Sequence, residues 1–289
     1  YGGVFPELAS RQHILTIKPV IEQALTTAQV GWQDIAAVAV TYGPGLAGSL
    51  LVGVNAAKGL AWARALPLIG VNHLEGHIYA NWLVEGPEPQ FPALCLVVSG
   101  GHTDLVFMRS HGQYERLGGT RDDAAGEAFD KVGRLLGLPF PGGPHVARAA
   151  LEGGPTKLHL PRAWMHGTFD FSFSGLKTSF LYFLRDRLKE DQQFIEKNKI
   201  DLCASLQDTI VSILISKLVK ASQQTGIREI GIAGGVSANS GLRNSLVREA
   251  ARRGWNLFVP PFSYTTDNAA MIGITGYYKF LRGEFAGQD

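Results

Sequence analysis

The sequence predicts an α/β protein in which buried strands run directly into paired glycines. Apolar runs of strand length alternate with segments of helical periodicity, which is the order that a covered, mostly parallel sheet produces. The 35 glycines collect in short clusters, and such clusters allow the backbone to approach an anion closely. A hydrophobic fraction of 45% and a charged fraction of 18% in 289 residues indicate a globular chain of two ordinary domains.

The first part of the chain alternates helices and strands. Residues 36–40 and 66–71 are apolar runs that predict strands, with helices before, between and after them, the last through Leu83. Ser49 is the expected N-cap of the middle helix. The apolar positions with helical spacing are Ile14, Ile17, Ile21 and Leu25, then Leu50, Val54, Ala57 and Leu60.

Residues 85–92, with three prolines and a glycine, mark the expected boundary between two lobes. Beyond them, the runs 93–98 and 104–108 flank a predicted hairpin turn. Residues 152–174 look irregular, helices are expected over 175–225, and the last elements alternate again. These are strands at 229–233 and 257–259, a helix through Arg253 and a final helix over 268–281.

The net charge of +2 is too small to predict a nucleic-acid partner by itself. Two cationic stretches are expected to be solvated helix faces: Arg243, Arg248, Arg252 and Arg253, and Arg185, Arg187 and Lys189. The two cysteines, Cys95 and Cys203, give no disulfide framework and favour a reducing compartment. No apolar run reaches the roughly 20 residues of a membrane helix.

His73 and His77 are the strongest metal candidates. They lie four residues apart at a predicted helix start, so both imidazoles face one side of the helix. A pair of partly buried structural histidines is the alternative. A zinc protease would need an acid directly after the first histidine, whereas Glu75 comes two positions later and faces away.

Asp267, just before the last predicted helix, is the candidate third ligand, with helix capping as the alternative. Two histidines and one carboxylate suit iron(II), zinc or manganese.

Two glycine segments are candidate phosphate sites. Residues 99–103 (Ser-Gly-Gly-His-Thr) join two apolar runs, and a plain hairpin turn is the alternative. Residues 234–239 (Gly-Gly-Val-Ser-Ala-Asn) follow a buried strand and open a helix, which directs free N–H groups at a ligand. Neither matches a dinucleotide fingerprint or a Walker loop.

An acidic run precedes further candidates. Asp122, Asp123 and Glu127 suit an exposed helix start, whereas Asp130 is suited to bind ribose hydroxyls. Residues 141–144 (Pro-Gly-Gly-Pro) offer bare backbone on which an adenosine could lie. Lys177 lies just inside a predicted helix start, where ordinary capping is the alternative reading.

In this order, the motifs resemble the TsaD family, the tRNA threonylcarbamoyladenosine transferases once described as sialoglycoprotein endopeptidases, in their bacterial form. The resemblance spans the chain from end to end. It is carried by residues 2–11 (GGVFPELASR), 73–77 (HLEGH), 98–103 (VSGGHT), 126–131 (GEAFDK), 141–144 (PGGP), 171–178 (FSFSGLKT), 234–239 (GGVSAN) and 266–270 (TDNAA).

This resemblance implies an actin-like ATPase fold of two lobes, residues 1–92 with 268–289 and residues 93–267. It implies metal ligands at His73, His77 and Asp267, and substrate or nucleotide contacts at Val97, Val98, Ser99, Gly100, Gly101, Asp130, Gly143 and Asn239. Two departures stand out. The family's first strands and their phosphate loop are expected to precede Tyr1, and residues 145–147 (His-Val-Ala) lack an acid that several members carry.

The implied reaction transfers threonylcarbamoyl from threonylcarbamoyl-AMP to N6 of adenosine 37 in tRNAs that read codons beginning with A. The implied cofactors are one divalent metal per chain, Fe²⁺ before Zn²⁺, and an adenine nucleotide. The implied partners are tRNA and TsaB- and TsaE-like subunits, in the cytoplasm and without a membrane. Two alternatives remain open: a non-catalytic actin-like ATP-binding scaffold and a metalloprotease.

Overall fold

The computed structural model describes residues 5–155 and 167–287, which divide into two compact units. The first unit comprises Tyr1–Leu83 and Asn268–Asp289, and the second comprises Val84–Asp267. The first segment of this unit ends at Leu83, whereas the sequence predicts the boundary after residue 92. The second segment begins at Asn268. Residues 2–4 of the opening motif and 156–166 of the irregular stretch lie outside the described residues.

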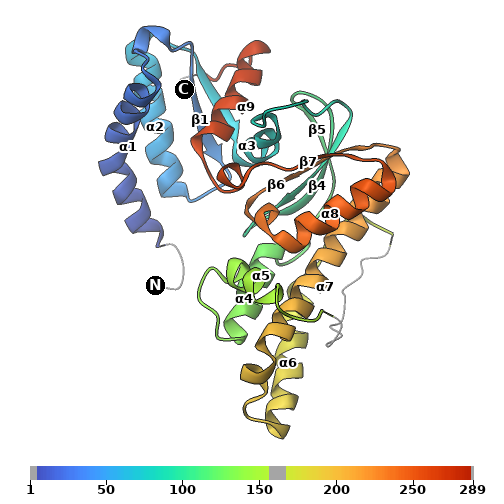
Figure 1. The fold of residues 1–289 in the computed structure, drawn as a ribbon. Helices are drawn as coiled ribbons and strands as arrows, with labels where there is room; N and C mark the ends of the chain where they lie inside the picture. Colours follow the sequence, from blue (N-terminus) through green and yellow to red (C-terminus); the bar gives the residue numbers. More distant parts are fainter. Residues whose placement is uncertain (1–4, 156–166, 288–289) are drawn as a thin grey trace. The chain divides into compact units, whose positions relative to one another are not determined.

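A parallel pair of strands, β1 and β2, forms the sheet of the first unit (Figure 1). The helix α2 connects the two strands, and Ala57 and Ala61 on α2 pack against Leu68 on β2. Ser49 does not cap α2, because the extended backbone ends at Leu46 and Ser49 already lies in the first helical turn. The elements are α1 (Pro6–Ala28), η1 (Trp32–Asp34), β1 (Val38–Gly43), α2 (Ala47–Arg64), β2 (Leu68–Asn72), α3 (His73–Tyr79), η2 (Ala80–Trp82) and α9 (Ala269–Leu281).

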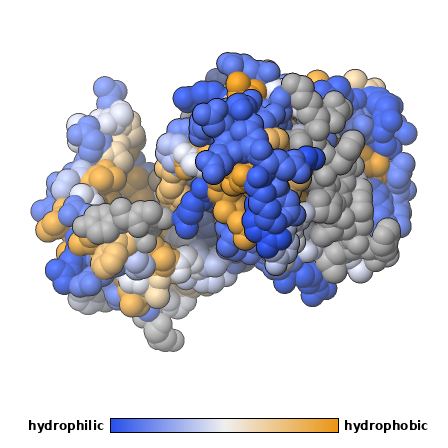
Figure 2. All heavy atoms as spheres, turned by 90° about the horizontal axis from the view of Figure 1, so that it is seen from below, coloured by the Kyte–Doolittle hydropathy of each residue, from blue (hydrophilic) through white to orange (hydrophobic). Residues whose placement is uncertain are grey.

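Apolar side chains remain exposed on α1, which buries none of its residues. Figure 2 shows hydrophobic patches between hydrophilic residues on one face of the protein. The large apolar side chains exposed on α1 or directly before it are Phe5, Leu8, Ile14, Leu15 and Val20.

The second unit contains a five-stranded sheet in the order β5-β4-β3-β6-β7. The central strand β3 is buried along its whole length, and it pairs antiparallel with β4 and parallel with β6. The sheet is therefore mixed. The sequence did not predict the edge strand β5, because its residues form no apolar run and Gln113, Glu115 and Arg116 are polar and exposed. The strands are β3 (Ala93–Val98), β4 (Thr103–Ser110), β5 (Gln113–Gly119), β6 (Glu229–Ala233) and β7 (Asn256–Phe258).

Helices pack on this sheet and supply most of the core. Leu96 of β3, Phe129 of α4, Phe180 of α6 and Leu214 of α7 belong to one buried apolar cluster. The helix α7 has the length and apolar composition of a membrane span, but 67% of the most apolar window is buried, as in a core helix. The helices are α4 (Ala125–Leu135), α5 (Gly142–Ala150), α6 (Ser174–Glu190), α7 (Phe194–Thr225), η3 (Gly235–Ala238), α8 (Ser240–Arg253) and η4 (Phe262–Tyr264).

Candidate functional site

The glycine segments of the second unit meet at the carboxyl ends of β3 and β6. The two strands are parallel neighbours, and Val97 pairs with Ala233 at their last shared position. The chain turns sharply after β3: the Ser99 N–H donates to the His102 carbonyl at 2.8 Å, and the His102 N–H donates to Ser99 Oγ at 3.1 Å. Ligands of open α/β sheets bind at such carboxyl ends.

Close backbone contacts define this site, which we call the glycine cradle: residues 97–101, the start of α4 at Gly126, and residues 234–239. A Cβ added at Gly126 would lie 2.6 Å from the Ser99 carbonyl oxygen, and one at Gly234 would lie 2.5 Å from that of Val98. Gly234 also has a φ of +85°, which L side chains rarely adopt. Glycine is therefore required at both positions.

Open space lies beside the other glycines of the cradle. A Cβ added at Gly100, Gly101 or Gly235 would meet nothing within 4 Å. Within residues 5–155 and 167–287, the Gly100 and Gly101 N–H groups donate to no acceptor. The Gly235 N–H, at the first position of η3, has no partner within that short helix. Unpaired amides beside open space are the donors that an anionic group needs.

Asp130 lies one helical turn after Gly126, on the same face of α4. Its Oδ1 accepts the Gly142 N–H at 2.7 Å and the Gly143 N–H at 3.4 Å, so the carboxylate caps the start of α5. Among the residues that the structure describes, none donates a hydrogen bond to the other carboxylate oxygen, Oδ2. Residues 142–144 form the first turn of α5, and Asp130 already accepts two of its amides, so this backbone is less free for a ligand than the sequence predicts.

Asn239 is the N-cap of α8, a role that fixes its side chain inside the cradle. Its Oδ1 accepts the Leu242 N–H at 3.0 Å, and its Nδ2 donates to Gln207 Oε1 at 2.8 Å. The sequence did not identify Gln207, for which a polar residue in the apolar stretch of α7 was the only signal. Asn239 keeps one amide hydrogen for a ligand.

Asp122 organises the segment that carries Lys177. It accepts hydrogen bonds from the Phe173 N–H at 2.8 Å and the Ser174 N–H at 3.2 Å, and from the Ser172 hydroxyl at 2.6 Å. Partial burial acts to raise the pKa of Asp122, but these hydrogen bonds together hold it below its usual value. The acid therefore caps α6 from a distant part of the chain, and Lys177 is exposed in its first turn.

Both cysteines of the chain are buried in this unit as free thiols. Burial raises the pKa of Cys95 to about 12 and that of Cys203 to about 11, so both thiols stay protonated at neutral pH.

The predicted metal ligands come together at the start of α3. The Asn72 side chain caps this helix by accepting the Leu74 N–H at 2.9 Å, and His73 and His77 follow one turn apart. Their ring centroids are 4.7 Å apart, and His77 is 2% exposed. The ligand atoms of His73, His77 and Asp267 all lie within 4.8 Å of one another, a donor set that fits a divalent transition metal.

Asp267 is held in place by the capped start of α9, which follows it directly in the chain. It directly precedes Asn268, whose side chain caps α9 by accepting the Met271 N–H at 2.8 Å. The expectation that Asp267 itself caps the helix is wrong, because its neighbour has that role. Gly76 allows α3 and α9 to approach, since a Cβ there would lie 2.8 Å from the Ile272 side chain.

Glu75 points to α9 and forms an ion pair with Lys279, with 3.1 Å between Oε2 and Nζ. Both side chains are mostly buried, at 21% and 14% exposure. This contact turns the carboxylate toward α9. It argues against the metalloprotease alternative, in which the general base must face a water on the metal.

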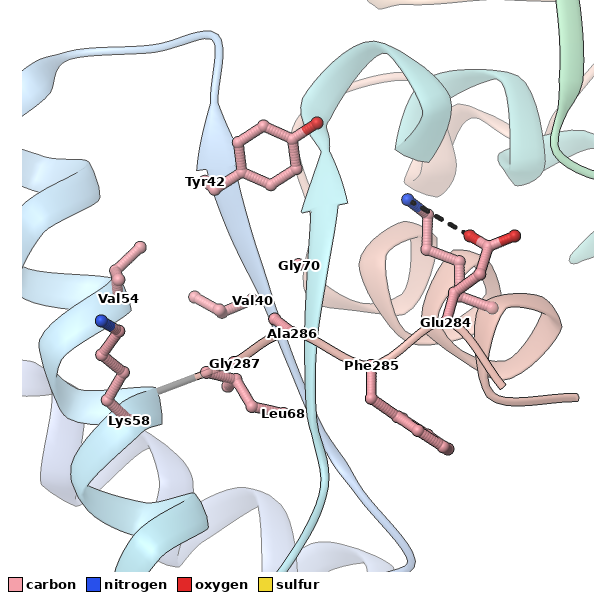
Figure 3. A pocket seen from close by; sticks show the side chains of 11 residues that line it. Val40, Tyr42, Val54, Lys58, Leu68, Gly70, Glu284, Phe285, Ala286 and Gly287 are labelled. Carbon is pink, nitrogen blue, oxygen red and sulfur yellow. Dashed lines mark ion pairs between the residues drawn. The ribbon is translucent and has the colours of Figure 1, made fainter. Parts of the chain in front are cut away.

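A separate pocket of about 530 Å³ lies on the β1–β2 sheet of the first unit (Figure 3). Val40 and Gly70 of the strands form its floor, Lys58 of α2 lines one side, and Glu284 and Phe285 line another. No predicted site residue lines it. This pocket is thus separate from His73, His77 and Asp267.

Comparison with solved structures defines the fold class. Full-length HypF in its phosphate- and nucleotide-bound form aligns with a TM-score of 0.61 at 15% identity, over 93% of this chain and 50% of that one. Component A of (R)-2-hydroxyglutaryl-CoA dehydratase from Acidaminococcus fermentans aligns with a TM-score of 0.51 at 17% identity, over 91% of this chain and 83% of that one. The chain has the actin-like ATPase fold.

Sequence comparison gives the family. Residues 1–274 match TsaD, the tRNA N6-adenosine threonylcarbamoyltransferases. The protein of that name from Porphyromonas gingivalis is 53% identical over all of this chain and 86% of its own length. The one from Symbiobacterium thermophilum is 55% identical over 98% of this chain and 82% of its own. The chain belongs to the TsaD family.

Proposed function

We propose that the chain transfers the threonylcarbamoyl group from threonylcarbamoyl-AMP to N6 of adenosine 37, in tRNAs that read codons beginning with A. Membership of the TsaD family over residues 1–274 supports this activity. The glycine cradle is the observation that carries it, because unpaired amides beside open space suit the phosphate of an adenylate.

In the proposed reaction, the N6 amine attacks the carbamoyl carbon of the mixed anhydride. The new C–N bond replaces the C–O bond to phosphate, AMP leaves with that bonding pair, and N6 loses a proton. The amides of Gly100, Gly101 and Gly235 neutralise the negative charge on the departing phosphate. The free oxygen of Asp130 and the free amide hydrogen of Asn239 are suited to hold the ribose and adenine of the adenylate.

We propose one divalent metal per chain at His73, His77 and Asp267, with Fe²⁺ preferred and Zn²⁺ as the alternative. When bound, such an ion supplies Lewis-acid polarisation to a donor oxygen. The residues themselves orient that position: the capped start of α3 holds both imidazoles on one face, and the capped start of α9 fixes Asp267.

We also propose that the chain works in the cytoplasm with TsaB- and TsaE-like partner subunits. The target adenine must leave its stack to expose N6. The tRNA-facing surface therefore includes more than the cradle, and partner subunits extend it.

The test supplies unmodified tRNA, threonylcarbamoyl-AMP and the partner subunits, and measures threonylcarbamoyladenosine by nucleoside mass spectrometry. A matched tRNA with guanosine at position 37 lacks the N6 amine and is the control. We expect product only with adenosine 37 and only when the chain is present. Nucleotide binding without product, unchanged in a His77→Ala variant, would favour the non-catalytic scaffold instead.

A further inference from the structure

Arg243 differs from the other cations of its helix. Arg252 and Arg253 form ion pairs with Glu249, and Arg248 is exposed and donates to Ser245 Oγ. In contrast, Arg243 is half-buried and forms no ion pair with any residue in 5–155 or 167–287. The expectation of a fully solvated cationic face is wrong at this position, because the guanidinium turns back toward the cradle.

The partners of Arg243 come from two segments at the carboxyl ends of neighbouring strands. Nε donates at 2.7 Å to the carbonyl of Ser237, which lies in η3 after β6. One Nη donates to the Pro260 carbonyl at 2.8 Å, in the segment after β7. The guanidinium carbon also lies 4.1 Å from the centroid of the Phe262 ring, a cation–π contact.

These two segments belong to different proposed binding sites, one for the adenylate and one for the metal. Ser237 lies in the cradle, two residues before Asn239, whereas the segment after Pro260 continues through η4 to Asp267. Thr265 is 1% exposed and its hydroxyl donates to the Phe262 carbonyl at 2.8 Å, which fixes the end of η4. A planar guanidinium with fixed donors is suited to hold two carbonyls at a set distance.

We infer that Arg243 is a positioning residue that couples adenylate binding in the cradle to metal binding through Asp267. The inference rests on the proposed function, because it needs both ligands to bind. An adenylate that orders residues 234–239 then also orders the segment that ends in Asp267, so each ligand strengthens the binding of the other. Reciprocal coupling of this kind amounts to about 5- to 150-fold in affinity.

The test measures the dissociation constant of Mn²⁺ with and without saturating AMP, by calorimetry on the full chain. We expect AMP to tighten Mn²⁺ binding by about 5-fold or more, and the ratio to fall below about twofold in Arg243→Met. Arg248→Met, the same change at an exposed site of the same helix, should keep the wild-type ratio. Arg243→Lys keeps the charge but cannot hold both carbonyls, so it should also lose most of the coupling.

The outcomes separate this inference from the proposed function. If the wild-type chain binds neither Mn²⁺ nor AMP, the proposed function fails and the inference fails with it. If it binds both without coupling, or if Arg243→Lys retains the full wild-type ratio, only the inference is overturned. Thermal melting identifies any variant that does not fold. If Arg243→Met does not fold, the ratio measured for Arg243→Lys tests the inference instead.

Discussion

The metal ligands and the glycine cradle are built in opposite ways. The proposed metal site uses the side chains of His73 and His77 on α3, so removal of a few atoms deletes a donor. The cradle presents backbone amides, and it depends on atoms that are absent: a Cβ at Gly126 or Gly234 would collide with a carbonyl oxygen. A side-chain site is therefore lost by truncation, whereas a backbone site is lost by addition.

The largest expected effect separates the two sites by truncation. His77→Ala should weaken metal binding by at least about 100-fold, since loss of a second-shell partner alone costs about 10- to 100-fold. Measured without added metal, where the coupling through Arg243 makes no contribution, AMP affinity should remain within a factor of about two to three of wild type. Metal content by mass spectrometry and AMP titration by calorimetry test both. His13→Ala, on the exposed face of α1, is the control, and retained metal in His77→Ala would contradict the assignment.

The converse change adds one methyl group to the cradle. Gly126→Ala places a Cβ 2.6 Å from the Ser99 carbonyl, and overpacking of this kind costs about 1–3 kcal/mol. We expect AMP affinity to fall about 10-fold or more, with metal binding kept. Gly59→Ala, where an added Cβ meets nothing, should leave AMP binding unchanged. Equal AMP affinity in both variants would show that the turn after β3 does not contact the nucleotide.

A substitution at Glu75 tests whether this acid acts together with His73, His77 and Asp267. Glu75→Gln breaks the ion pair with Lys279 and should lower the free energy of unfolding by about 1–2 kcal/mol. Transfer activity should persist because the carboxylate faces α9. Lys279→Met should give a similar loss, and the double variant should lose less than the sum. An activity loss in Glu75→Gln with metal still bound would instead give Glu75 a catalytic role.

The smallest effect concerns Asp122, which caps α6. Asp122→Ala should reduce the free energy of unfolding by about 1 kcal/mol at pH 7. The folded-state pKa of Asp122 is lowered, so its contribution is present above the unfolded value of about 3.9 and is lost as the pH falls through the folded value. Urea unfolding should show a smaller difference in the free energy of unfolding between wild type and Asp122→Ala at pH 3 than at pH 7. The exposed variant Glu152→Ala should match wild type at pH 7. A gap that widens at low pH would contradict the capping role.

Local patterns predicted most of the residues that the structure brings together in the cradle and in the cluster of His73, His77 and Asp267. Strands that end in paired glycines, and two histidines one helical turn apart, depend only on residues close in sequence. The partners that hold these groups could not be predicted in the same way. Asn239 meets Gln207 through hydrogen bonding across 32 positions, and Asp122 meets Ser172 across 50. Such pairs are fixed by how α6, α7 and α8 pack, which a single sequence does not encode locally.

Errors in the sequence analysis have the same origin. The strand β5 lacks an apolar run because it lies at the edge of the sheet. The backbone of residues 141–144 was expected to be free for an adenosine, because Asp130, which accepts the Gly142 N–H, belongs to another helix. Arg243 departs from the expected solvated face because its guanidinium donates to the Ser237 and Pro260 carbonyls.

The most direct test of the two-site account is a crystal structure of the chain with Fe²⁺ and AMP, with the metal located by anomalous scattering. The account predicts an iron peak coordinated by ligand atoms of His73, His77 and Asp267, and the AMP phosphate against the amides of Gly100, Gly101 and Gly235. Iron bound elsewhere, or a phosphate that contacts none of these amides, would contradict it.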